Sequence, residues 1–137
     1  LVATPPAISD GPTGREHELP PVLVVDDNPI NLKVACALVE KSGYRTLSAR
    51  NGAEAVDIVT RESVLAVLMD CDMPVMDGFV ATEHIRGLDS EVALVPVVAL
   101  TASAMPEELA RCRQAGMNDC LIKPVSLEQI RNTLRQV

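Results

Sequence analysis

The chain has 137 residues, of which 47% are apolar but only 1% aromatic, so it is long enough to bury one aliphatic core without disulfides or a structural metal. Twelve basic residues against nineteen acidic ones leave a formal net charge of −7, which repels nucleic-acid phosphates and anionic lipid headgroups. We therefore expect no nucleic-acid binding and no membrane contact by this segment.

The cysteine pattern argues against a zinc site, because it contains no Cys-x-x-Cys pair and no histidine at ligand spacing. Cys36, Cys71, Cys112 and Cys120 are expected to be free thiols, as is typical of a reducing cytoplasm. No apolar run approaches the ~20 residues that a membrane helix needs, and no signal peptide opens the chain. These features predict a cytoplasmic location and leave open an inner-membrane anchor elsewhere in a longer parent protein.

Residues 1–21 have the composition of a linker, with five prolines and two glycines among scattered polar residues. Such a segment buries too little apolar surface to order itself. The first residue is Leu1 rather than methionine, and we therefore expect the chain to be cut from a longer protein.

After the linker, strand-like and helix-like segments alternate. VLVVD (22–26) is a continuous apolar run that ends in an acid, which predicts a buried strand. A helix is predicted over about 29–42, because a proline stands at its first position and Gly43 directly follows it. The segment 44–49 predicts a short strand, and 52–62 predicts a second helix.

The same alternation continues in the second half of the chain. VLAVLMD (64–70) is another apolar run that ends in an acid. A loop marked by proline and glycine, CDMPVMDG (71–78), leads into a helix predicted from about residue 78 to residue 86. VPVVALT (95–101) predicts a third buried strand and MPEELARCRQA (105–115) a fourth helix.

The chain closes with a short strand, 119–123, and an amphipathic helix, 126–136, with Ser126 as its N-cap and Glu128 in its first turn. Strands that are apolar along their whole length and alternate with helices indicate a parallel sheet covered on both faces. We therefore predict one α/β domain over 22–137, a doubly wound (βα)5 fold.

Five polar side chains stand at the ends of the predicted strands. They are Asp26, Asp27, Asp70, Thr101 and Lys123. In such a sheet, ligands bind beyond the carboxyl ends of the strands. A single aspartate there is often only a helix cap. Five such residues on four strands predict a functional site at this edge.

The chemistry of these side chains points to phosphoryl transfer. Three neighbouring carboxylates repel one another, and a divalent cation would relieve that repulsion. Their hard oxygen atoms favour Mg²⁺ over zinc or copper. A lysine and a threonine hydroxyl would stabilise the charge on a phosphoryl group. One carboxylate would then act as the nucleophile and form an aspartyl phosphate.

The segments VLVVDDNPIN, VLMDCDMPVMDG, VVALTA and DCLIKP resemble the signature segments of response-regulator receiver domains, in order and at the family's spacings. The resemblance implies a flavodoxin-like, five-stranded parallel sheet in the order 2-1-3-4-5. It also implies a phosphorelay function, in which a phosphohistidine donates its phosphoryl group to an aspartate in the presence of Mg²⁺. The group is then passed to a histidine phosphotransfer partner or hydrolysed, so Mg²⁺-dependent self-phosphorylation and dephosphorylation are implied as well.

The same resemblance assigns roles to individual residues. Asp70 is the implied phosphoacceptor and also contacts the Mg²⁺ ion. Asp27 is implied as a direct ligand of the ion, Asp26 as a ligand through water, and Asp72 as a ligand through its main-chain carbonyl.

Thr101 and Lys123 are implied to contact the phosphoryl group, and the peptide bond from Lys123 to Pro124 is expected to be cis. Two positions depart from the family's pattern. Cys120 stands where an aromatic switch residue is usual, and Asp72 borders the route by which water would attack the phosphate.

Two alternative functions are less consistent with the sequence. The sequence DCDM at 70–73 matches the D-x-D signature of haloacid-dehalogenase-like phosphatases, but that family places the nucleophile before the acidic pair and not after it. A receiver fold used only for protein contacts is disfavoured by the presence of all five polar residues.

The sequence also carries features that bear on the origin of the segment. They favour the C-terminal receiver of a hybrid sensor histidine kinase as the source of this segment. The features are the proline-rich tether, the lack of an initiator methionine, the lack of an output domain after the last helix, and the stretches NPINLKVA and ALTASAM. Its phosphodonor domain would then lie in the same protein. A stand-alone single-domain response regulator is the alternative.

Overall fold

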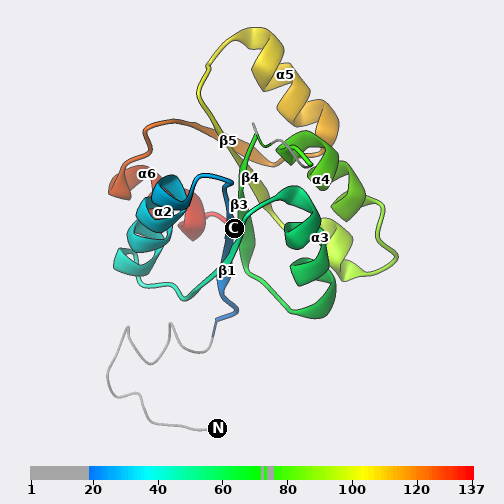
Figure 1. The fold of residues 1–137 in the computed structure, drawn as a ribbon, viewed down its shortest axis with the longest axis horizontal. Coiled ribbons are helices and arrows are strands. Elements are labelled where there is room, and N and C mark those ends of the chain that lie inside the picture. Colours follow the sequence, from blue (N-terminus) through cyan, green and yellow to red (C-terminus); the bar gives the residue numbers. More distant parts are fainter. Residues whose placement is uncertain (1–18, 72, 74–75) are drawn as a thin grey trace, which may run out of the picture.

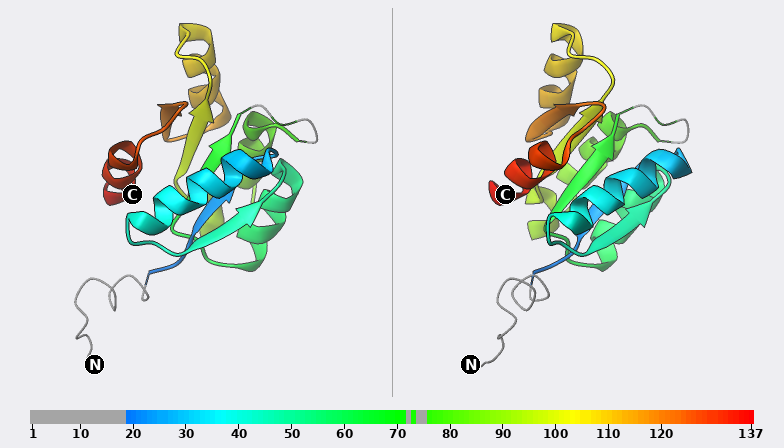
Figure 2. Two further views of the ribbon diagram at one scale, coloured as in Figure 1. Left: turned by 60° about the vertical axis from the view of Figure 1, so that its left-hand side comes forward. Right: turned by 90° about the vertical axis from the view of Figure 1, so that its left-hand side faces the viewer.

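The centre of the structure, a computed structural model that describes residues 19–71, 73 and 76–137, is a parallel sheet of five strands in the order β2-β1-β3-β4-β5. The strands are β1 (Val22–Val25), β2 (Thr46–Ala49), β3 (Ala66–Asp70), β4 (Val97–Thr101) and β5 (Asp119–Ile122). Helices cover both faces of this sheet (Figure 1; Figure 2). The doubly wound (βα)5 fold and the strand order are confirmed.

The helices of the described residues lie where the sequence predicts them. They are α2 (Pro29–Lys41), α3 (Gly52–Arg61), α4 (Gly78–Arg86), α5 (Pro106–Ala115) and α6 (Leu127–Arg135). A short 3-10 helix, η2 (Glu91–Leu94), was not predicted and precedes β4. None of the helices in these ranges is long and apolar enough to cross a membrane.

Three strands begin two residues later than predicted, at Thr46, Ala66 and Val97. The reason is the register of the sheet. Val22, the first residue of β1, pairs with both Thr46 and Ala66, and Val97 pairs with Val67 of β3. The residues that precede these positions have no register partner in the sheet and stay in the connecting segments.

Alternate residues of each inner strand pack against opposite helix layers. In β1, Leu23 and Val25 belong to the core cluster shared with α3, α4 and α5, whereas Val22 and Val24 belong to the cluster shared with α2 and α6. All four side chains are fully buried. Burial on both faces explains why the strand sequence is continuously apolar.

The start of α2 is fixed by Asn28, whose side chain accepts hydrogen bonds from the N–H groups of Ile30 at 2.9 Å and Asn31 at 3.2 Å. Pro29 occupies the first turn, and Gly43 follows the helix with a φ of 99°, as predicted. This cap places the first turn of α2 directly after the acidic end of β1.

Tight packing also fixes the start of α4. A Cβ atom on Gly78 would collide with the backbone oxygen of Asp70, so only glycine lets the helix approach the end of β3 this closely. The N–H of Gly78 donates to the carbonyl of Cys71 at 3.3 Å. The backbone of Asp70 is therefore held from the side by α4.

Candidate functional site

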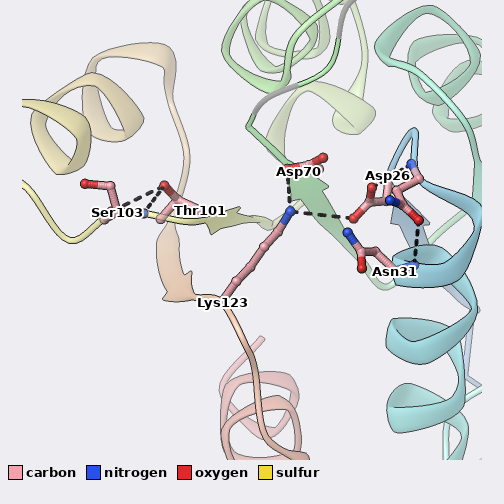
Figure 3. A network of polar contacts seen from close by, with 7 residues as sticks. Asp26, Asn31, Asp70, Thr101, Ser103 and Lys123 are labelled. Carbon is pink, nitrogen blue, oxygen red and sulfur yellow. Dashed lines mark hydrogen bonds and ion pairs between the residues drawn. The ribbon is translucent and has the colours of Figure 1, made fainter.

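The carboxyl ends of four strands bring the predicted polar residues to one edge of the sheet (Figure 3). They are Asp26 and Asp27 after β1, Asp70 at the end of β3, Thr101 at the end of β4 and Lys123 after β5. Four of these side chains converge, and the fifth, Thr101, lies on the same edge with its hydroxyl turned towards Ser103.

Three carboxylates form the acidic centre of the site. One oxygen atom from each of Asp26, Asp27 and Asp70 lies within 4.8 Å of the other two. Asp26 and Asp70 are each only 2% exposed, whereas Asp27 is half-buried. Hard oxygen ligands at this spacing fit a divalent cation such as Mg²⁺. The predicted ligand Asp72 lies outside the described residues.

Lys123 supplies the positive charge of the site. Its Nζ lies 2.9 Å from Oδ1 of Asp70 and 3.7 Å from Oδ2 of Asp26. The backbone N–H of Lys123 donates to the carbonyl of Thr101 at 2.7 Å, which aligns the residue with the end of β4. The peptide bond to Pro124 is cis, as the resemblance implied.

The environment of Asp26 opposes its ionisation. Burial is the largest influence and raises the pKa of its carboxyl group, and the nearby carboxylates of Asp70 and Asp27 raise it further. The hydrogen bond from the Asn28 N–H to Oδ1, 2.9 Å long, and the charge of Lys123 both act in the opposite direction. A cation bound beside Asp26 would favour the charged form.

Thr101 is fully buried, and its hydroxyl is engaged with the following turn. The hydroxyl donates to the carbonyl of Ser103 at 3.3 Å and accepts from the N–H of Ser103 at 3.2 Å. To contact a phosphoryl group on Asp70, this hydroxyl would have to exchange these bonds.

An open cleft of about 290 Å³ leads away from the site between α2 and the segment after β5. Its residues are Asp26, Asn31, Val34, Ala35, Leu100, Lys123, Pro124 and Val125. One end is therefore polar and charged, and the rest is apolar. Sequence reasoning missed Asn31, which Figure 3 shows beside Asp26 and Lys123. The sequence signal that could have revealed Asn31 was its spacing from the helix cap Asn28. Residues three apart lie on the same side of a helix, so Asn31 faces the same way as the cap.

Arg111 is exposed on α5 and also makes contacts within the domain. Its guanidinium lies 4.1 Å from the ring centroid of Phe79 and 3.8 Å from Oδ2 of Asp77, so it joins α5 to the start of α4. Arg113 is exposed. Cys71, next to Asp70, is 1% exposed and lies in the apolar core.

A family model described as the response regulator receiver domain matches residues 22–135 of this chain. The sensor histidine kinase RcsC of Escherichia coli (strain K12) is 40% identical over 113 residues. These residues are 82% of this chain and 12% of that protein, so the chain spans only a small part of the curated relative it matches.

Two solved structures extend the comparison. The receiver domain of sensor histidine kinase PA1611 from Pseudomonas aeruginosa PAO1, with a magnesium ion coordinated in its active site cleft, is 39% identical with a TM-score of 0.80. The match covers 86% of this chain and 96% of that one. The second is a co-crystal structure of the Saccharomyces cerevisiae phosphotransfer protein Ypd1 and the receiver domain of its downstream response regulator Ssk1. It matches at 30% identity and a TM-score of 0.76, covering 86% of this chain and 89% of that one.

Proposed function

Since this chain belongs to the family of response regulator receiver domains, we propose that Asp70 is its phosphoacceptor. As a receiver domain, it acts in a two-component phosphorelay. The haloacid-dehalogenase-like alternative is rejected, because the whole segment from residue 22 to residue 135 matches the receiver family. The observation that carries the residue assignment is the contact of 2.9 Å between Lys123 Nζ and Asp70 Oδ1 inside a cluster of three carboxylates.

The residues of the site fit a direct transfer of the phosphoryl group. A carboxylate oxygen of Asp70 attacks the phosphorus of a phosphohistidine, an O–P bond forms as the N–P bond breaks, and the imidazole leaves. The Lys123 ammonium, already beside the nucleophilic carboxylate, then pairs with the phosphoryl oxygens. The Thr101 hydroxyl, at the end of β4, could donate to the same group after its O–H leaves the carbonyl of Ser103.

Asp26, Asp27 and Asp70, with the main-chain carbonyl of Asp72, are proposed to hold Mg²⁺. When bound, the ion would neutralise the carboxylates and the incoming phosphoryl oxygens. The related PA1611 receiver domain holds a magnesium ion in its active site cleft, which supports the choice of metal.

The proposed partners are two histidine-bearing proteins. We infer that a histidine kinase domain, in the same protein if the parent is a hybrid sensor kinase, donates the phosphoryl group. A histidine phosphotransfer protein would receive it. The similarity to RcsC supports the hybrid parent, and the Ypd1 complex of the Ssk1 receiver domain supports the second partner. A stand-alone regulator stays the alternative.

The surface next to the site suits a protein donor or acceptor. Ile30 and Val34, one turn apart on α2, are 73% and 54% exposed, although both are large apolar side chains. Val34 also lines the cleft that ends at Asp26 and Lys123. A protein that brings a histidine to Asp70 has to cover this edge, so it would bury these two side chains. Ile30→Asp should slow transfer from phosphorylated Ypd1 more than it slows labelling by acetyl phosphate.

The proposal is tested by intact mass after treatment with acetyl phosphate and Mg²⁺. The unchanged chain should gain one phosphoryl group, and Asp70→Asn should gain none. Asp57→Asn is the matched control, because Asp57 is an exposed aspartate on α3 that only pairs with Arg61. Full labelling of Asp70→Asn would show that another residue accepts the group.

A further inference from the structure

Two cysteines that phosphoryl transfer does not use lie side by side between α5 and β5. Cys112 is on the inner face of α5, and Cys120 is the second residue of β5. The two thiols interact with each other, and α5 packs directly against β5. Both thiols are free, and both line one cavity of about 280 Å³, together with the sulfur-containing side chain of Met117.

The two thiols differ in their access to solvent. Cys112 is 3% exposed and is part of the apolar core cluster beneath α5. Cys120 is half-buried and packs against the edge of the same cluster. A reagent in solution therefore reaches Cys120 first, and Cys112 lines the same cavity as any adduct formed there.

We propose that Cys112 and Cys120 form a reversible disulfide when the protein meets a low-molecular-weight disulfide such as oxidised glutathione. The thiolate of Cys120 attacks one sulfur of the reagent, its S–S bond breaks, and one glutathione leaves as a thiol. The thiol of Cys112 then loses its proton and attacks the Cys120 sulfur, which releases the second glutathione. Two cysteine thiols are oxidised and one disulfide is reduced to two thiols, so atoms and electrons balance.

The surroundings of Cys120 set the speed of this reaction. Burial, followed by the adjacent Cys112, raises the pKa of Cys120 to about 11, and Asp119 and Glu108 act in the same direction. Arg113, the basic residue that lines the cavity, is the one nearby cation among the described residues of this pocket. Since the thiolate is the nucleophile, the first step is slow at neutral pH and accelerates as the pH rises towards 11.

The bond would tie α5 to β5, the strand that directly precedes Lys123. Ala99 of β4 is the register partner of Cys120. Lys123 lies three residues after Cys120, directly after the end of β5. A covalent link at Cys120 would therefore hold α5 against the edge strand of the sheet, three residues before Lys123. This inference does not depend on the phosphoacceptor assignment.

The test is incubation of the full reduced chain with oxidised glutathione, followed by alkylation of remaining thiols and peptide mapping. We expect a cross-linked peptide pair that contains Cys112 and Cys120, with a mass two hydrogens below that of the two separate peptides. Cys36→Ala, on the opposite side of the sheet, should behave like the unchanged chain. A lasting glutathione adduct on Cys120 of the unchanged chain would overturn the proposal.

Two variants separate the steps. Cys112→Ala should trap glutathione on Cys120, because no second thiol is present to displace it. Cys120→Ala should leave Cys112 as a free thiol, because Cys112 is shielded. Amide NMR spectra show whether each variant is folded. If either variant is unfolded, peptide mapping of the unchanged chain decides the proposal. Equal modification of Cys112 in Cys120→Ala would show that the predicted order of attack is wrong.

Discussion

The ammonium group of Lys123 lies 2.9 Å from a carboxylate oxygen of Asp70, although 53 residues separate the two in the chain. The same ammonium lies 3.7 Å from Asp26, so one cation from the end of β5 faces carboxylates from two other strands. The contact depends on strand order, because β3, β4 and β5 are neighbours in the sheet. It places a positive charge where a phosphoryl group on Asp70 would need it.

Removal of this charge is expected to impair transfer without unfolding the domain. The side chain of Lys123 is 29% exposed and contacts the site through its ammonium, so Lys123→Ala leaves the apolar clusters intact. We expect labelling by acetyl phosphate to slow by about 10²–10³-fold, the usual effect of losing one group that stabilises developing charge. Rates of mass increase measure this effect, and Lys33→Ala, an exposed lysine on α2, is the control. Loss of the folded NMR spectrum in Lys123→Ala would instead assign the lysine a structural role.

The three carboxylates are expected to contribute unequally to Mg²⁺ binding. Asp27 is the proposed direct ligand, whereas Asp26 is proposed to act through water and already accepts a hydrogen bond from the Asn28 N–H. Calorimetric titration with Mg²⁺ should therefore show a larger loss of affinity in Asp27→Ala than in Asp26→Ala. Equal losses would contradict the proposed division between a direct and a water-mediated ligand.

The stability of the α4–α5 side of the domain is expected to depend on Arg86. Its guanidinium donates to the carbonyls of Gly116, Ala93 and Val95 and to Oδ1 of Asn118, at 2.7–2.9 Å. Arg86→Ala leaves the three carbonyls without this donor, whereas Oδ1 of Asn118 still accepts from the Val97 N–H at 2.9 Å. We expect a loss of about 2–4 kcal/mol in the free energy of unfolding.

Urea denaturation measures this loss against a matched control. Arg61 forms an exposed pair with Asp57 on α3, so Arg61→Ala should cost less than about 1 kcal/mol. Arg86→Lys should recover little, because a single ammonium does not reproduce the planar donor set of the guanidinium. Similar midpoints for the two arginine-to-alanine variants would show that the Arg86 network contributes little.

Arg86 also illustrates what the sequence does not reveal. The apolar runs, with the acids that end them, predicted the strands and their arrangement in a parallel sheet. They also predicted the edge of the sheet at which Asp26, Asp70 and Lys123 meet. Each of these signals is local in the chain. The partners of Arg86 lie up to 32 residues away, in η2 and in the turn before β5, and no periodicity marks such a contact.

The same limit applies around the site. Thr101 was correctly placed at the end of its strand, but the bonds of its hydroxyl with Ser103 depend on the turn that follows β4. The exposure of Ile30 and Val34 was also not predicted, because an apolar residue on a helix is ordinarily assigned to the core. Packing decides which face of a helix meets the sheet, and on α2 the buried residues are Leu32, Ala35 and Val39.

The response of α5 and α6 to phosphorylation is expected to be small, because of the residue at position 120. The resemblance to receiver domains implies a switch that is usual in this family. An aromatic ring on the fifth strand moves when the threonine hydroxyl is drawn towards the phosphate. Here that position is Cys120, a small side chain held beside Cys112. Phosphorylation shifts a conformational equilibrium only if it interacts differently with the two conformations. The small Cys120 side chain occupies nearly the same volume in either rotamer, so it can transmit little change to α5 and α6. Amide NMR shifts with and without beryllofluoride and Mg²⁺ measure the response.

Large shifts should be confined to the loops near Asp27, Asp70 and Thr101, and residues 106–115 and 127–135 should change little. Cys120→Tyr provides the matched comparison, because it restores a ring at this position of β5. If an aromatic is what couples the site to α5, the shifts of this variant should extend into α5 and α6. Extensive shifts across both helices in the unchanged chain would show that the coupling works without an aromatic residue. The contacts of Arg111 with Phe79 and Asp77 would then be the next candidate for that coupling, since they link α5 to the helix that packs on the backbone of Asp70.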